Sequence, residues 1–217
     1  MLNYYNPNMI FTLILIFYFV PLVIGFFLGK KKVVNTSDIS EIGKNLADPV
    51  TKKIHNWSRK YKMLCIKNEN WGLLFILILL NNLVLAAFIT KIFYGIIFLI
   101  PLLLTAWEGF GHGVVFSKPK ARGGIILTFF EFGGYLFATV IGVEFGLKLF
   151  DTIFFNKQLI IEIPWLYVQL TIGSLVVGAL IESLSIKAVS KKVDLSDIDK
   201  TDFKKRRKEI AKYVDEG

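Results

Sequence analysis

Long apolar runs separated by short basic segments are the dominant pattern of this 217-residue chain. The first run, residues 9–28, carries no charge and has the length that an α-helix needs to cross a bilayer. Similar runs predict four further spans at about 71–90, 93–107, 125–149 and 164–181. The pattern therefore predicts an all-α, polytopic membrane helical bundle with about five transmembrane helices.

Lysine and arginine are distributed unevenly between the predicted loops. Segments 29–70, 108–124 and 187–217 together hold 23 of the 26 lysine and arginine residues. Cytoplasmic loops are enriched in both residues, so we predict that the N-terminus lies outside and the C-terminus inside. The formal net charge of +9 is thus explained by topology, and we predict no specific nucleic-acid partner.

The predicted domains follow these boundaries. Residues 1–29 hold the first span, 30–70 a cytoplasmic basic segment, 71–186 the transmembrane core, and 187–217 a basic cytoplasmic tail. Apolar residues in the basic segment recur every three or four positions, which is typical of amphipathic helices, and Pro49 divides them into two. These helices either lie on the inner membrane surface or pack under the bundle.

A stripe of small residues is predicted on the fourth span. It consists of residues four positions apart, namely Gly134, Ala138, Gly142 and Gly146. On a helix this spacing forms one smooth surface that another backbone can approach closely, which is how helices associate in a membrane. We expect the stripe to pack within one chain, and the alternative is that it joins two copies of the chain.

Polar residues interrupt two of the apolar spans. Asn81 and Asn82 lie near the middle of the second span, and Glu131 lies beside the stripe of small residues. An intramembrane carboxylate is costly unless it is protonated or partnered, so Glu131 is a functional-site hypothesis by default. We expect Glu131 and Asn81 to reach similar depths and to form a structural hydrogen bond. A proton- or cation-sensitive switch at Glu131 is the alternative.

A glycine-rich turn is expected on the inner side after the third span. It would contain Glu108, Gly109 and His112, although the third span could instead extend to Phe116. His112 has no cysteine or carboxylate at metal-binding spacing, so we expect a loop histidine and predict no metal or cofactor.

These features together resemble the stage II sporulation protein M family of membrane proteins. That family pattern has an asparagine pair in an early span, an Asn-Gly before a glycine-rich turn, and a His-Gly-x-x-Glu start to a helix rich in small residues. The matching residues here are Asn81, Asn82, Gly109, Glu131, Ala138, Gly142 and Gly146. The resemblance covers roughly residues 70–185 and implies an integral, non-enzymatic component of a membrane complex.

The chain also departs from the pattern of that family. Glu108 stands where the family usually has asparagine, and Leu127 and Thr128 replace the histidine and glycine before Glu131. These departures argue against a metal or proton-relay role that would need the missing histidine.

The basic tail contains the densest cluster of positive charge, at Lys204, Lys205, Arg206, Arg207 and Lys208. This cluster could bind anionic lipid headgroups or RNA, or could serve orientation alone. The chain has no nucleophile elbow, zinc-protease or phosphate-loop motif, so we predict that it is not an enzyme.

We predict a non-enzymatic scaffold or subunit of a complex in the cell membrane, with other membrane proteins or a second copy of the chain as partners. The alternative function is a dimeric small transporter or channel in which Glu131 is the ionisable element.

Overall fold

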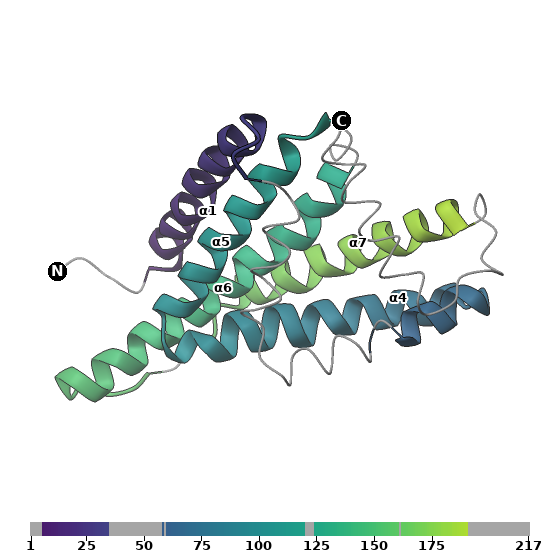
Figure 1. Ribbon diagram of the computed structural model, residues 1–217. Coiled ribbons are helices and arrows are strands. Elements are labelled where there is room, and N and C mark those ends of the chain that lie inside the picture. The colour runs from purple at the N-terminus through teal and green to yellow at the C-terminus, as the bar shows by residue number, and fades with distance from the viewer. Residues whose placement is uncertain (1–5, 35–57, 59, 120–123, 161, 191–217) are drawn as a thin grey trace.

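The computed structural model describes residues 6–34, 58, 60–119, 124–160 and 162–190 (Figure 1). These residues form an all-α bundle, which confirms the predicted fold class. Five helices are long and apolar enough to cross a membrane, as predicted. They are listed here with their labels: α1 (Pro7–Lys30), α4 continuing through η1 and η2 (Trp71–Ile96), α5 (Leu99–Phe116), α6 (Ile125–Phe155) and α7 (Trp165–Ser190).

The second span changes its helical geometry along its length. Residues Trp71–Leu80 form an α-helix (α4), Asn81–Ile92 form wider π-helical turns (η1), and Phe93–Ile96 form a short 3₁₀ helix (η2). The predicted connection at Lys91 is therefore wrong, because Lys91 lies inside this continuous helical segment. Its charge suggested a span boundary, whereas the structure gives it a partner within the bundle.

The third span also extends further than its first predicted boundary. Helix α5 continues to Phe116, which was the alternative end of this span. The predicted inner-side turn at Glu108, Gly109 and His112 is wrong, because these residues lie in the middle of α5. The glycines do not interrupt helix α5 here. Because they have no side chain, the backbone of α1 can come close to them.

The bundle consists of two helix pairs with α6 between them (Figure 1). Helices α1 and α5 lie side by side, while α4 and α7 cross the view at a shallower angle. Consecutive spans run in opposite directions, so α6 ends and α7 begins at the same end of the bundle, which we call the α6–α7 end. This alternation agrees with the predicted grouping of loops, and which membrane face each end occupies stays a prediction.

Helix α6 supplies more members of the largest hydrophobic cluster than any other helix does. The buried members of this cluster are Ile10, Ile14 and Tyr18 from α1, Leu102 from α5, Phe132, Leu136, Val140 and Val143 from α6, and Tyr167 from α7. A second cluster joins α4 to α7 through Leu74, Ile78 and Ala179. Helix α6 is therefore the central element against which both pairs pack.

Two sets of glycines allow the closest helix contacts. On α5, a Cβ added at Gly113 would lie 2.7 Å from the backbone nitrogen of Phe26 in α1. On α6, added Cβ atoms at Gly142 and Gly146 would meet the backbones of Lys91 and Gly95. Within the stripe of small residues, Gly142 and Gly146 thus pack against the second span of the same chain, whereas Gly134 packs against Leu175 of α7.

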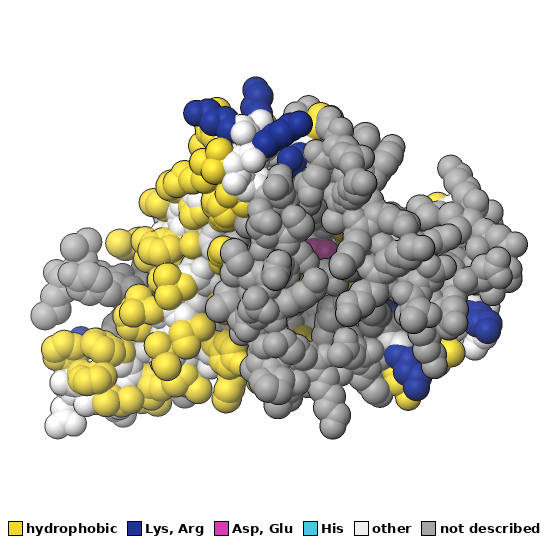
Figure 2. All heavy atoms as spheres, in the orientation of Figure 1, with side chains coloured by type: hydrophobic (Ala, Val, Ile, Leu, Met, Phe, Trp, Pro, Cys, Tyr) yellow, Lys and Arg dark blue, Asp and Glu magenta, His cyan; other side chains and the backbone are white. Residues whose placement is uncertain are grey.

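Large apolar side chains cover much of the outside of the bundle (Figure 2). Phe129, Ile126 and Phe154 are each about two-thirds exposed or more. In Figure 2 the hydrophobic surface of α1 ends at a group of lysines, which matches the basic segment that begins at Lys30. Such a surface fits the hydrocarbon of a bilayer bounded by a polar interface.

Most of the predicted amphipathic segment and most of the predicted basic tail (187–217) lie outside the described residues, and residues 187–190 of the tail belong to the end of α7. Of the segment 30–70, residues 60–67 are helical and end just before α4. The cluster Lys204–Lys208 lies outside the described part of the chain.

Candidate functional site

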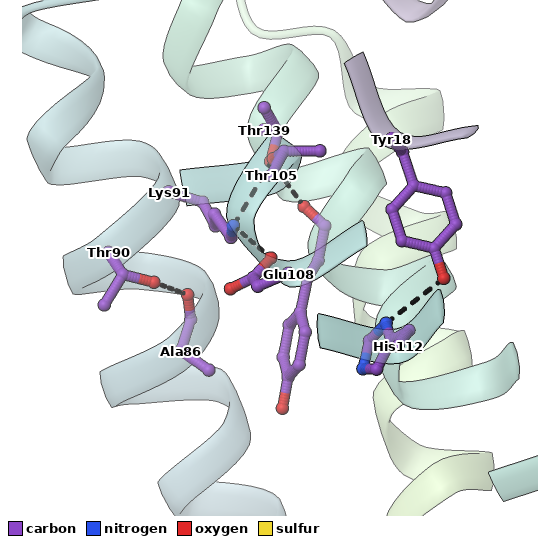
Figure 3. Close-up of polar contacts among 9 residues, drawn as sticks. Tyr18, Ala86, Thr90, Lys91, Thr105, Glu108, His112 and Thr139 are labelled. Atoms are coloured by element: carbon purple, nitrogen blue, oxygen red, sulfur yellow. Dashed lines mark hydrogen bonds and ion pairs between the residues drawn. The ribbon is translucent and has the colours of Figure 1, made fainter. Parts of the chain in front are cut away.

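A charged pair lies inside the bundle, between the second and third spans (Figure 3). The Nζ atom of Lys91 lies 2.6 Å from Oε2 of Glu108. The side chain of Lys91 is 1% exposed and that of Glu108 is 34% exposed. The lysine is therefore withdrawn from all solvent, whereas its carboxylate partner reaches the edge of the packed interior.

Two threonines extend this pair toward α6. Lys91 donates a weak hydrogen bond to Thr105 at 3.4 Å, and the hydroxyls of Thr105 and Thr139 are 3.4 Å apart. Thr139 in turn donates to the carbonyl oxygen of Tyr135 at 2.8 Å. Figure 3 shows these side chains converging from three helical elements, η1, α5 and α6. We call Lys91, Thr105, Glu108 and Thr139 the central polar cluster.

Histidine 112 lies one turn beyond Glu108 and faces α1. Its Nδ1 atom is 3.1 Å from the hydroxyl of Tyr18, and its ring meets the ring of Phe132 edge-on at 4.9 Å. The described residues contain no group of three or more histidine, cysteine, aspartate or glutamate side chains that could hold a metal ion. His112 is thus part of an aromatic contact between α1, α5 and α6.

Glutamate 131 has a partner on the second span, but it is not the predicted one. Asn82 donates a hydrogen bond to Oε1 of Glu131 at 2.8 Å, and Asn81 donates to Asn82 at 3.3 Å. The expected Glu131–Asn81 contact is therefore wrong by one residue. Adjacent residues of a helix point about 100° apart, so only one of these two asparagines can face α6 directly, and that one is Asn82.

Glycine 178 of α7 makes room for the carboxylate. A Cβ added at Gly178 would lie 2.7 Å from Cγ of Glu131. Glu182, one turn further along α7, is close enough to act electrostatically on Glu131. Two acidic side chains and an asparagine therefore meet where α6, α7 and η1 come together.

One face of α6 connects this acidic group with the central polar cluster. Glu131, Tyr135 and Thr139 are four residues apart, so they lie one above another on the helix. The rise from Glu131 to Thr139 is about 12 Å. The two groups thus occupy different depths in the bundle, and Tyr135 lies between them on the same face of α6.

Only some residues of this site could be recognised from the sequence. Glu131, Asn82 and Glu108 stood out as polar residues in or beside apolar runs. Lys91 was equally visible, but a single lysine between two apolar runs is also typical of a short loop. Thr105 and Thr139 carry no sequence signal, since membrane helices commonly contain threonine.

A buried ion pair can serve two physical purposes. Desolvation of both charges offsets most of their attraction, so such a pair is weak evidence for stability and can instead fix which residues face one another. Inside a membrane, ionisable groups can also carry protons or ions.

Comparisons of the chain with protein-family models, with curated proteins and with solved structures find no match.

Proposed function

We propose that the chain is a multi-pass scaffold or subunit of a complex in the cell membrane, without catalytic activity of its own. The observation that carries this proposal is the pairing of interior charges within the chain. Lys91 bonds to Glu108, Glu131 bonds to Asn82, and Glu144 bonds to Lys148. The first two contacts join different helical elements, and the third lies within α6, so these groups use their hydrogen-bonding capacity inside the chain.

Few buried side-chain atoms of the described bundle could still form a hydrogen bond. The buried side-chain atoms without a partner there are Oδ1 of Asn81 and Oε2 of Glu144. A pathway for a polar substrate would need more side chains with unpaired hydrogen-bond donors or acceptors. The resemblance to the stage II sporulation protein M family also supports this proposal, because that family consists of integral components of membrane complexes.

The apolar exterior of the bundle supports partners that are also membrane proteins. Phe129, Ile126 and Phe154 expose large side chains that could meet lipid or the membrane helices of another protein. We therefore expect the partners to be other membrane proteins.

Purification of the full chain from its native membranes tests this function. Tagged protein is solubilised in mild detergent, and the mass and composition of the particle are measured. We expect a second protein in fixed stoichiometry, retained by the double variant Lys91→Met/Glu108→Leu, in which the ion pair is replaced by apolar side chains. The variant Gly142→Leu, which separates α6 from η1, serves as the disrupted control. Recovery of the chain alone, as a monomer or a homodimer, would contradict the proposal.

A second function is favoured by the polar face of α6. The series Glu131, Tyr135, Thr139 links two groups of ionisable side chains at different depths, which is an arrangement that could carry protons or small cations. In liposomes with a pH-sensitive dye, this function predicts proton uptake that Glu131→Gln abolishes and that Glu69→Gln, outside the spans, leaves unchanged. Uptake equal to that of empty liposomes would exclude proton transport.

A further inference from the structure

We propose that the α6–α7 end of the bundle binds a phospholipid whose headgroup carries a primary amine, with one acyl chain lying beside η1 and α6. The site consists of a polar cavity and an adjoining apolar groove. The polar cavity has a volume of about 610 Å³. Its charged lining residues are Glu144, Lys148, Asp151, Lys157 and Glu162.

Glutamate 144 is the residue of this cavity whose unsatisfied hydrogen-bonding capacity indicates a ligand. The residue is 5% exposed, and its Oε1 atom accepts a bond of 2.7 Å from Lys148. Its Oε2 atom is buried and has no hydrogen-bond partner among the described residues. Leaving a buried carboxylate oxygen unpaired is costly, so a donor brought by a ligand would be bound strongly. A primary ammonium group is a donor of opposite charge.

The other charged side chains of the cavity are complementary to a zwitterionic headgroup. Lys157 pairs with Asp151, and the Lys157 side chain is 60% exposed, so it can turn to a phosphate at the mouth. Glu162 adds a further carboxylate. Three carboxylates and two ammonium groups thus face a headgroup that itself carries one ammonium and one phosphate.

The adjoining groove identifies the ligand as a lipid. It has a volume of about 330 Å³ and shares Glu144, Lys148, Glu162, Ile163 and Pro164 with the polar cavity. Its other lining residues are all apolar, namely Phe88, Ile92, Phe93, Ile96, Ile141 and Phe145. Phe88 and Phe93 are each 55% exposed, so the groove opens toward the hydrocarbon. A headgroup in the polar cavity would therefore place an acyl chain in the groove.

Headgroup chemistry sets the expected order of affinities. Phosphatidylethanolamine can donate N–H bonds to Glu144, whereas the quaternary ammonium of phosphatidylcholine has no N–H to donate. Phosphatidylglycerol has no positive charge at all. One charge-assisted hydrogen bond should make the affinity for phosphatidylethanolamine about tenfold or more higher than that for the other two lipids.

The test is lipid binding to the purified, delipidated full chain in detergent, measured by native mass spectrometry and by thermal shift. We expect phosphatidylethanolamine to bind about tenfold more tightly than phosphatidylcholine or phosphatidylglycerol. Glu144→Gln should remove this preference, and Glu69→Gln, an exposed carboxylate away from the cavity, should keep it. Equal affinity of the parent for phosphatidylethanolamine and phosphatidylcholine would overturn the proposal, and this comparison needs no variant.

A second comparison separates a lipid from a soluble ligand. The variant Ile141→Trp, which fills the apolar groove, should weaken binding of phosphatidylethanolamine about tenfold or more and leave binding of soluble phosphoethanolamine unchanged. If phosphoethanolamine binds as tightly as the lipid, and Ile141→Trp has no effect on either, the ligand is a soluble zwitterion and the lipid assignment is wrong.

Discussion

Removing either partner of the Lys91–Glu108 pair should destabilise the bundle, and the two removals should differ in size. Glu108→Leu leaves the ammonium group of Lys91, which is 1% exposed, with only the weak contact to Thr105. Lys91→Met leaves Glu108, whose side chain is 34% exposed and is therefore less enclosed by protein than the ammonium group. The loss of the carboxylate should therefore be the more damaging of the two.

The expected magnitudes follow from the burial of each charge. Leaving a buried charge without its partner costs about 3–5 kcal/mol, which we expect for Glu108→Leu. Lys91→Met should cost about 1–3 kcal/mol, since the remaining carboxylate lies at the edge of the packed interior and is less enclosed than the ammonium group. The double variant Lys91→Met/Glu108→Leu replaces both charges by apolar side chains of similar volume. It should therefore have a free energy of unfolding within about 1 kcal/mol of the parent, or higher.

The measurement is the free energy of unfolding in mixed micelles of mild detergent and dodecyl sulfate, followed by tryptophan fluorescence. Lys157→Met is the matched control, because Lys157 also pairs with a carboxylate but is 60% exposed. An exposed ion pair contributes about 0–1 kcal/mol, so this control should change the free energy of unfolding little.

Two results would refute this account of the central polar cluster. One is a double variant as unstable as Glu108→Leu alone. The pair would then add stability to the bundle, and each charge would do more than offset the cost of burying the other. The other is Lys91→Met and Glu108→Leu both matching the Lys157→Met control. Lys91 would then not be enclosed in the bundle.

Three further outcomes test the packing of the bundle. Gly142→Ala should destabilise by about 1–3 kcal/mol, because its methyl group meets the backbone of Lys91, while Gly133→Ala, with open space around it, should be neutral or stabilising by up to about 1 kcal/mol in the same unfolding assay. Glu131→Gln should stay within about 1 kcal/mol of the parent because it still accepts from Asn82, whereas Glu131→Ala should cost about 1–3 kcal/mol. Burial raises the pKa of the Cys65 thiol, so maleimide labelling near neutral pH should be at least about tenfold slower in folded than in unfolded protein, and equal rates would contradict the packing of residues 60–67 against α4.

The number of spans and their approximate positions were available from the sequence because they depend on a local property, whereas the boundary between the second and third spans was not. About twenty consecutive apolar residues match the thickness of a bilayer whatever the rest of the chain does. The stripe of small residues on α6 was visible for the same reason, since its members share one helix face at a fixed spacing. The sequence by itself therefore determined the fold class and one surface of the central helix.

The partner of each interior side chain was decided only by the tertiary structure. Lys91 looked like a loop residue until Glu108, 17 positions away, was placed beside it. Asn82 rather than Asn81 meets Glu131, and the pattern of apolar residues does not reveal which of two adjacent asparagines faces the neighbouring helix. Contacts between distant residues depend on how the helices cross, which the spacing of residues along any one helix cannot fix.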